Sequence, residues 1–556
     1  MSDVVADPRY GRGGMARHAL IVMVMTVLSG LLGILRESVV AGQFGTGDAY
    51  AAYVAAFRLP NIIYFLVIGG ALGSAFIPVF TAYLARRDDE GAWRLASKVL
   101  NLALIVAVIG AGLVFLLAPW LVRWVIAPGF PEQQQVLTVR LTRLLLLQPI
   151  LLGLGGLAMA TLNAFRRFLL TSLAPVIYNL GIIVGALFLA PYWGIDGLVV
   201  GVLVGAAAYL LLLVPGLFLC RMHYSFSFDW REPGVREVGR LLLPRILGQA
   251  AFQINFIAIT ALASLSGDVV VGAAAAAGAE MTSSPESLAV TAINYAYLLL
   301  NQPLSVLGVS LGTVVFPTLA TLANEGSLDL FRLTLTRIVR VVLFLSLPLS
   351  ALMFVLRVPI IHLLFERGEF TAISTEATAQ AFLFFSLGLA AVCVTEIALR
   401  AFYALHDTRT PVIVGAIVVA LNIGLGAALL QVMGFTGLVL SFTLTNSLET
   451  VVLLLLLRRR IHGVEGKTLF WSGSRSLGAA VLAAVIVALL LPLVEWLVPG
   501  AGLVTQLARL AGLTLLGGGV YLAALAILRS PELGEAWALV RRRLRGAAAP
   551  EGVPEE

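Results

Sequence analysis

Residues 99–121 read VLNLALIVAVIGAGLVFLLAPWL, and no charged side chain interrupts them. A helix needs about 20 mostly apolar residues to cross the hydrocarbon core of a bilayer, so this stretch predicts a transmembrane helix. Similar runs recur along the chain, whose 556 residues are 60% hydrophobic and 12% charged, with a mean hydropathy of +0.98. Soluble domains carry roughly 25% charged residues. The composition therefore excludes soluble, collagen-like, disordered and coiled-coil proteins and predicts an all-α, polytopic membrane protein.

Hydropathy, with Gly, Pro and charged positions as boundaries, predicts fourteen membrane-spanning helices. They lie at residues 18–38, 49–84, 99–120, 137–162, 169–191, 196–219, 237–264, 288–322, 333–356, 376–404, 410–432, 436–457, 475–497 and 504–527. The second and eighth are too long to cross the bilayer straight. Each contains two prolines (Pro60 and Pro78; Pro303 and Pro317), which predicts a bend or break in each.

The distribution of basic residues predicts the orientation in the membrane. Most of the 37 Lys and Arg residues fall in every second connection, such as Arg86–Lys98, Arg166–Arg167 and Arg458–Arg460. The positive-inside rule places these connections and both termini in the cytoplasm, which requires an even number of spans. The connection at residues 267–284 has no basic residue and is expected to be an outer loop.

Two matched motifs predict an internal repeat. GGALGSAFIP at residues 69–78 matches GVSLGTVVFP at 308–317, and PVI at 175–177 matches PVI at 411–413, at nearly the same offset. An even number of spans separates the matches, so two lobes of six helices related by an axis along the membrane normal are expected. On the sixth span, Gly197, Gly201 and Gly205 predict a face for close helix packing.

The predicted divisions follow from this repeat. They are a cytoplasmic N-terminal tail (1–17), an N-lobe of spans 1–6 (18–220), a cytoplasmic linker (221–236), a C-lobe of spans 7–12 (237–460), spans 13–14 (461–528), and a cytoplasmic interfacial helix with a disordered tail (529–556).

Charged and polar residues inside the spans are the candidate substrate-binding residues, because burial of an ionisable group in a membrane costs free energy. Arg36 and Glu37 are expected at the end of the first span, Asp48 at the start of the second, and Arg58 and Asn61 within it. Arg245 lies in the seventh span. A cationic surface of this kind suits phosphate oxygens, which arginine binds bidentately.

Each of these candidates also has a structural interpretation. Arg36 and Arg58 could pair with the nearby acids only to neutralise charge for insertion, and Arg245 could extend towards the interface. Glu396 and Arg400 have the spacing of a local helical ion pair.

Catalysis and cofactor binding have little support in the sequence. The two cysteines, Cys220 and Cys393, lie in separate apolar segments, and the five histidines are scattered. There is no P-loop, metal-ligand spacing or catalytic dyad, so we expect no enzyme, no cofactor, no metal and no nucleic-acid partner.

Several motifs together resemble the MurJ/MviN lipid II flippases. They are GILRE (33–37), AFRLPN (56–61), AFIPV (75–79), LNAFRRF (162–168), FP (316–317), LFERGEFT (364–371) and DTRTPV (407–412). The resemblance covers about residues 15–460, in the order of the family.

The resemblance implies a fold and a function. The fold is that of the multidrug/oligosaccharidyl-lipid/polysaccharide exporter superfamily: two six-helix lobes in a V around a cationic central cavity, and two C-terminal helices that form a groove for the polyprenyl tail. The function is alternating-access transport of lipid II, the peptidoglycan precursor, to the outer face of a bacterial cytoplasmic membrane, by a monomer in contact with membrane lipids.

The sequence departs from the family at the cavity arginines. Four arginines line the cavity in typical members, and their positions here hold Gly30, Arg36, Tyr64 and Leu298. The family's acidic position in the second span is Gly69, and Tyr297 precedes Leu298 where the family has an acid. An exporter or flippase of another lipid-linked oligosaccharide or polysaccharide is therefore the alternative.

Overall fold

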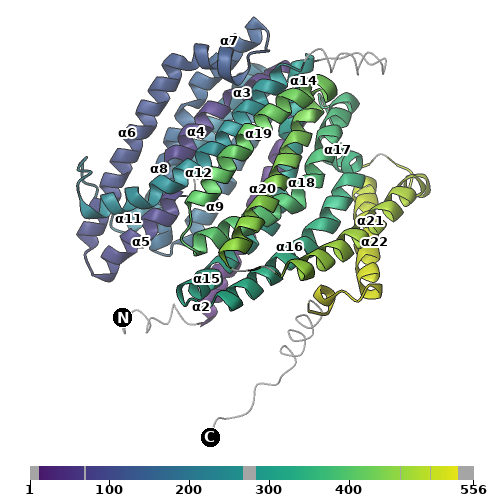
Figure 1. Ribbon diagram of the computed structural model, residues 1–556. Coiled ribbons are helices and arrows are strands. Elements are labelled where there is room, and N and C mark those ends of the chain that lie inside the picture. The colour runs from purple at the N-terminus through teal and green to yellow at the C-terminus, as the bar shows by residue number, and fades with distance from the viewer. Residues whose placement is uncertain are drawn as a thin grey trace. The chain divides into compact units, whose positions relative to one another are not determined.

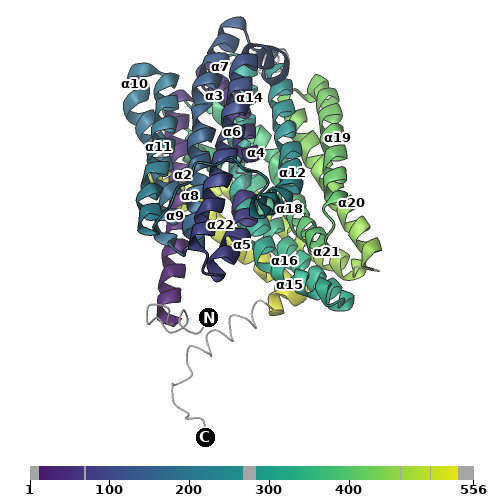
Figure 2. The same ribbon diagram turned by 90° about the vertical axis from the view of Figure 1, so that its left-hand side faces the viewer.

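The computed structural model describes residues 12–67, 71–266, 283–461, 463, 465–500 and 502–535. Within these ranges every regular element is a helix (Figures 1 and 2). The all-α fold is confirmed.

Among the described residues, the first half of the chain contains thirteen helical segments. They are α2 Arg12–Phe44, α3 Asp48–Ala56, α4 Arg58–Val67, α5 Ala71–Ala85, α6 Asp89–Leu121, η2 Val122–Ile126, α7 Glu132–Leu145, α8 Leu147–Ala164, α9 Phe168–Val184, η3 Gly185–Leu189, α10 Ala190–Trp193, α11 Ile195–Leu219 and α12 Pro233–Ser264.

The second half continues with the helices that follow residues 267–282, which lie outside the described ranges. They are α14 Pro285–Leu304, η4 Ser305–Ser310, α15 Leu311–Asn324, α16 Leu328–Val355, α17 Arg357–Phe365, α18 Ala372–Ala404, α19 Arg409–Met433, α20 Phe435–Arg460, α21 Gly466–Leu497 and α22 Leu503–Ile527.

This is a multi-pass membrane protein. Among the described residues, 12 helical stretches are long and apolar enough to cross a bilayer. The two other expected spans correspond to the broken helices α3–α5 and to α12, of which the shorter apolar pieces Ala75–Ala85 and Gln253–Ser264 are described in full. The total of fourteen stays a prediction.

The second span is broken, as its prolines predicted. Helix α3 ends at Ala56, Phe57 forms its C-cap, and α4 begins at Arg58. Pro60 therefore lies in the first turn of α4, where a missing backbone N–H costs no helical hydrogen bond. Pro78 lies inside α5.

The eighth span is continuous but irregular. Helix α14 ends one residue after Pro303, and the π-helical segment η4 follows before α15 resumes the α-helical pattern. Proline removes one hydrogen bond from the ladder, and a π turn is a common local response. The predicted irregularity in this span is confirmed.

The predicted C-terminal boundary of the first span was wrong. The predicted helix stops at residue 38, whereas α2 runs to Phe44. Arg36 and Glu37 thus lie inside the helix, not at its end. Their mutual ion pair explains the difference, because pairing lowers the cost of charge within a transmembrane helix.

The chain divides into two compact units. Unit 1 comprises residues 1–294, 364–377 and 423–438, and unit 2 comprises 295–363, 378–422 and 439–556. The divisions expected from the repeat, with lobes joined at 221–236, remain a prediction. Gly69 lies outside the described residues, so its match to Gly308 also stays a prediction, as does that of Pro78 to Pro317.

Small residues bring two helices of unit 1 together. A Cβ atom at Gly181 of α9 would lie 2.3 Å from the Cα atom of Gly205 in α11. One at Gly185 would lie 2.5 Å from the Cα atom of Gly201. No side chain fits at these separations, which confirms the close-packing face predicted on the sixth span.

In unit 2, α21 packs against both α16 and α22. Tyr521 of α22 donates a hydrogen bond from its hydroxyl to the Phe344 carbonyl of α16, with an O···O distance of 2.7 Å. Beyond α22, Glu532 contacts Arg340 of α16 and Ser472 of α21. The interfacial helix and tail predicted at residues 529–556 lie largely outside the described residues, which end at 535.

Candidate functional site

Arg36 is held by two side chains of unit 1. Its Nε donates to Glu37 Oε1 at 3.0 Å, and Nη2 donates to the same oxygen. Its Nη1 donates to the amide oxygen of Asn179 on α9 at 3.0 Å. The side chains of Arg36 and Glu37 are 23% and 15% exposed, so the pair is largely but not fully enclosed.

Two N–H groups of Arg36 are available to a ligand. A guanidinium carries five N–H groups, and the three bonds above use one on each nitrogen. One N–H on Nη1 and one on Nη2 therefore have no partner among the described residues. Two neighbouring donors of this kind match two oxygens of a phosphate group.

Helix α9 builds the wall beside Arg36. Asn179 is fixed by its amide nitrogen, which donates to the Ser29 carbonyl at 3.3 Å. The next residue towards the N-terminus, Tyr178, has its hydroxyl 3.4 Å from the Gln148 amide nitrogen. The Oε1 atom of Gln148 is buried and has no hydrogen-bond partner among the described residues. Polar atoms of α2 and α9 thus bind Arg36, and Gln148 of α8 contacts the neighbouring Tyr178.

The described contacts of Asp48 are with other residues than Arg36. Its Oδ1 accepts hydrogen bonds from the Ser284 backbone N–H at 3.0 Å and from the Ser284 hydroxyl at 2.8 Å. Gln134 links the same region, since its Nε2 donates to the Asp48 carbonyl at 3.0 Å and to the Ser287 hydroxyl at 2.7 Å. Asp48 therefore anchors the start of α14.

Arg58 joins α4 to α12. Its Nε donates to the Thr260 hydroxyl at 2.9 Å, and its guanidinium carbon lies 5.3 Å from the centroid of the Phe256 ring. A guanidinium over an aromatic face gains a cation–π attraction. These contacts give Arg58 a packing role between two helices of unit 1.

The last two candidates have fewer described contacts. Asn61 is partly exposed, and within the described residues its side chain makes no hydrogen bond. Arg245 lies on α12, but its side chain is outside the described part of the structure. The structure therefore brings Arg36 and Glu37 together and does not show Asp48, Arg58 or Asn61 in contact with them.

The family motif at residues 364–371 closes on the end of α2. The Glu369 N–H donates to the Gly42 carbonyl at 2.9 Å, and the Thr46 and Ser374 hydroxyls are 2.8 Å apart. Gly368 has φ +56°, and a Cβ atom there would lie 2.2 Å from the Gly42 carbonyl oxygen. Only glycine satisfies both the backbone conformation and this approach.

None of the other three family arginine positions holds an arginine, and contacts are described at or beside two of them. Tyr64 packs against an apolar cluster of unit 1. In unit 2, Tyr297, the residue before Leu298, has its ring centroid 5.8 Å from that of Phe385 and 6.4 Å from that of Phe442. At Gly30, no described atom lies within 4 Å of a Cβ position.

A second charged pair lies in unit 2. Arg400 of α18 pairs with Glu396 on the same helix and extends to the Val309 carbonyl at 3.4 Å. A Cβ atom at Gly312 would lie 2.4 Å from the Arg400 side chain. The local ion pair predicted from the i,i+4 spacing is confirmed, and the glycine makes room for it. Among the described residues, no group of three His, Cys, Asp or Glu side chains could hold a metal ion.

Comparison with known proteins identifies the family. A family model described as "Lipid II flippase MurJ" matches residues 40–507. The chain belongs to the MurJ family. It is 30% identical to the "Probable lipid II flippase MurJ" of Rhizobium tropici, over 94% of this chain and 95% of that protein. It is also 29% identical to the "Lipid II flippase MurJ" of Burkholderia cenocepacia, over 80% and 84% of the two chains.

Solved structures agree with the fold of the MurJ family. A structure described as "Lipid II flippase MurJ, inward closed conformation" matches with a TM-score of 0.71 at 21% identity and covers 92% of this chain and 98% of its own. A multidrug resistance MATE family transporter of the MOP superfamily, inward-facing, matches with a TM-score of 0.64 at 16% identity, over 80% and 98%. The expected superfamily fold is confirmed.

Sequence reasoning missed the partners of Arg36. Nothing in the sequence predicted a contact between Arg36 and Asn179, and Gln148 and Tyr178 gave no signal. The amide side chain of Asn179 within a predicted span was a weak clue to a contact between helices, because amides in spans commonly join helices by hydrogen bonds.

Proposed function

We propose that this protein moves lipid II from the inner to the outer face of a bacterial cytoplasmic membrane by alternating access. Membership of the MurJ family supports this transport function, and no catalytic step is needed for it. The basic connections support cytoplasmic termini and an outward direction of transport. We further propose that the protein acts as a monomer in contact with membrane lipids.

The observation that carries the proposal is the pair of donors left on Arg36. Lipid II joins its sugar to its polyprenyl tail through pyrophosphate, and that group needs closely spaced, oriented N–H donors. Glu37 and Asn179 hold the guanidinium in one orientation, which lowers the entropy lost when an anion binds. Glu37 also offsets the positive charge before the substrate arrives.

The remaining candidates take secondary roles in this proposal. Arg58, Asn61 and Arg245 are proposed as further contacts for the pyrophosphate and the sugar. Asp48, which binds Ser284, is proposed to hold the helix ends in place during one stage of the cycle, in addition to any contact with substrate.

The alternative has its own supporting observation. Gly30, Tyr64 and Leu298 stand at three positions where typical family members have cavity arginines. A substrate with a different saccharide or with less phosphate charge is then the second candidate: another polyprenyl-linked oligosaccharide or polysaccharide.

Complementation tests the first function against the second. The gene is expressed in a strain depleted of its own lipid II flippase, with Arg36→Ala as the matched inactive variant. Restored growth and cell shape with the wild-type protein alone supports lipid II transport. In parallel, purified protein in vesicles is given fluorescent lipid II or a polyprenyl-linked oligosaccharide without peptide. Flipping of the second lipid only would reject lipid II as the substrate.

A further inference from the structure

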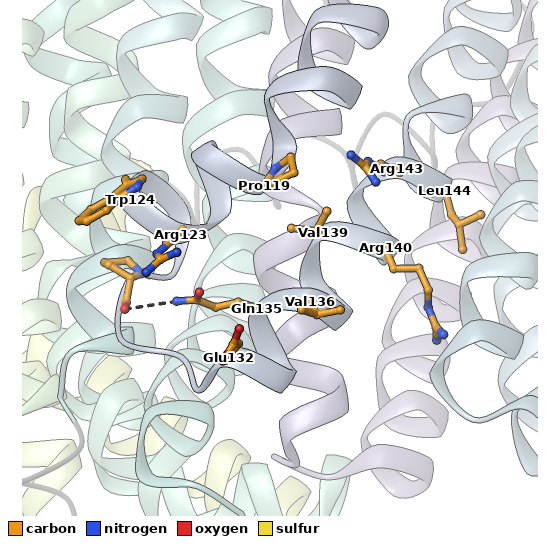
Figure 3. Close-up of a pocket in the computed structure, with 11 residues that line it drawn as sticks. Pro119, Arg123, Trp124, Glu132, Gln135, Val136, Val139, Arg140, Arg143 and Leu144 are labelled. Carbon is orange, nitrogen blue, oxygen red and sulfur yellow. Dashed lines mark hydrogen bonds between the residues drawn. The ribbon is translucent and has the colours of Figure 1, made fainter.

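A pocket of about 830 Å³ lies in unit 1 where η2 and the following loop face α7 (Figure 3). Its volume is in the range of known small-ligand sites, roughly 300–1,000 Å³. Arg123 and Trp124 lie at one side, Arg140 and Arg143 lie at the other, and Glu132 lies between them. No function assigned above uses this pocket.

The pocket lies at the level of the lipid headgroups. The helical path from Arg143 to the basic pair at Arg166 is about 34 Å at ~1.5 Å per residue, slightly more than the hydrocarbon core of a bilayer. The path from Lys98 to Arg123 is similarly about 37 Å. Both arginines therefore reach the membrane boundary opposite the basic connections.

The positive-inside rule disfavours arginine at the outer membrane boundary, so the presence of arginine there needs another explanation. The usual reason, pairing with a carboxylate, holds only for Arg140, which forms an ion pair with Asp196. In the part of the chain that the structure describes, neither Arg123 nor Arg143 forms an ion pair. Arg123 lies over the Trp124 ring, with its guanidinium carbon 5.6 Å from the centroid.

Arg143 is oriented by its surroundings. Its Nε donates to the Phe115 carbonyl at 3.2 Å, and its guanidinium carbon lies 4.7 Å from the Phe115 ring centroid. The bond to the carbonyl uses one of five N–H groups, so four remain for a ligand. An oriented guanidinium with free donors is suited to a phosphate group.

The loop that forms one wall is fixed in place. Gln135 donates from its side chain to the Ala127 and Pro128 carbonyls at 3.3 and 3.4 Å. The Gly129 N–H donates to the Ser264 hydroxyl at 3.1 Å. The pocket is thus formed before any ligand arrives, which reduces the cost of binding.

Two apolar residues that line the pocket are exposed. Trp124 and Val136 are 63% and 64% exposed. Tryptophan is enriched where a protein meets the interface of a bilayer, and exposed apolar side chains there contact acyl chains. A ligand in this pocket therefore has a charged head and an apolar tail.

From these observations we infer that the pocket binds the phosphate of a lipid headgroup in the leaflet opposite the basic connections, with Arg123 and Arg143 as its main contacts. An anionic glycerophospholipid is the first source of that phosphate, and the pyrophosphate of a polyprenyl lipid is the second. Glu132 opposes a net negative charge, so it sets the affinity. The inference does not depend on the proposed transport function.

Native mass spectrometry of the purified, full-length protein in detergent tests this inference, with phosphatidylglycerol, phosphatidylcholine, lipid II or inorganic phosphate added in turn. The wild-type protein should retain phosphatidylglycerol in preference to phosphatidylcholine. In the double variant Arg123→Gln/Arg143→Gln, the affinity for the bound lipid should fall at least tenfold, whereas Glu132→Gln should raise it several-fold.

Arg509→Gln is the matched control. Arg509 is expected on the same side of the membrane, and like Arg143 it donates to a backbone carbonyl, here that of Val498. Its change should leave lipid binding within twofold of wild type. Arg123→Lys/Arg143→Lys, which retains the charges, should keep part of the affinity.

The outcomes separate the sources. A loss confined to phosphatidylglycerol supports the glycerophospholipid, and a loss confined to lipid II supports the polyprenyl lipid. Unchanged binding of both lipids in the double variant, with unaltered elution on size-exclusion chromatography, overturns the inference. Inorganic phosphate that competes as strongly as either lipid overturns the assignment to a lipid.

Discussion

Arg36 shows how hydrogen bonds and an ion pair accommodate a charged residue inside a membrane helix. Neighbouring residues on a helix point about 100° apart and do not normally face each other, yet Glu37 reaches back to two guanidinium nitrogens. Asn179, from a different helix, holds the third nitrogen. Glu37 on the same helix thus neutralises the charge, and Asn179 on the other helix orients the guanidinium.

Loss of the Arg36 side chain should abolish transport without loss of protein. We expect Arg36→Ala to fail in complementation, because no other described guanidinium lies against Asn179. Arg36→Lys should recover only part of the activity, since an ammonium lacks the planar pair of donors. Growth and membrane protein level are measured together, with Arg509→Ala as the control. Full transport by Arg36→Ala would leave charge neutralisation as the only role of the pair.

Gly368 carries the second prediction at this scale. A side chain there is opposed both by φ +56° and by the Gly42 oxygen, which would lie 2.2 Å from the Cβ atom. Gly368→Ala should lower the free energy of unfolding by roughly 2 kcal/mol or more. The thermal midpoint in detergent reports this loss. Gly33→Ala, where no described atom lies within 4 Å of a Cβ position, should show none.

At the scale of elements, a buried carboxylate joins three helices of unit 2. Glu532 follows α22 and is only 5% exposed. Its Oε1 accepts from Arg340 Nε of α16 at 2.7 Å and from the Ser472 hydroxyl of α21 at 2.6 Å. Burial by itself raises the pKa of this carboxyl, but the bonds from Ser472, Ser530 and Arg340 outweigh it and lower the pKa to about 2.

This pKa predicts a pH-dependent contribution to stability. A carboxyl whose pKa falls on folding stabilises the fold above its unfolded pKa, about 4.3, and loses that effect as the pH falls towards 2. Glu532→Gln should therefore lower the thermal midpoint at pH 7, by an amount corresponding to about 2–3 kcal/mol. The difference from wild type should shrink below about pH 4.5.

The neighbouring pair supplies the control for Glu532. Glu535 binds Arg337 at 3.0 Å, but the two side chains are 41% and 67% exposed. Solvent screens such a pair, so Glu535→Gln should cost less than about 1 kcal/mol at pH 7. Equal effects of the two substitutions would show that the three-helix contact of Glu532 is not what stabilises this region.

At the scale of the whole molecule, the basic connections predict the direction of insertion. A cysteine at Ala275, in a protein with Cys220 and Cys393 replaced by serine, should react with a membrane-impermeant maleimide added to intact cells. A cysteine at Arg459 should react only after the cells are opened. The reverse pattern would invert the orientation and the direction of transport proposed here.

Local pattern was enough for the class of protein and most of its elements. Apolar runs such as residues 99–121 predict a helix because the bilayer demands a length of hydrocarbon and satisfied backbone hydrogen bonds, whatever lies next to it. Pro60 and Pro303 marked the two irregular spans because proline removes a backbone donor wherever it stands. The Gly197–Gly201–Gly205 series predicted close packing for a similarly local reason.

Tertiary structure alone decided what each polar group binds. Nothing near Arg36 in sequence indicates Asn179, nothing near Glu532 indicates Arg340, and the motif at 364–371 gives no sign of its contact with Gly42. Hydropathy indicates whether a residue favours an apolar environment over water. It does not indicate which of many similar helices packs against it. The sequence by itself thus determined an all-helical membrane protein with a charged pair in its first helix. The partners of this pair depend on helix packing, because hydrogen bonds require atoms within about 3 Å of each other.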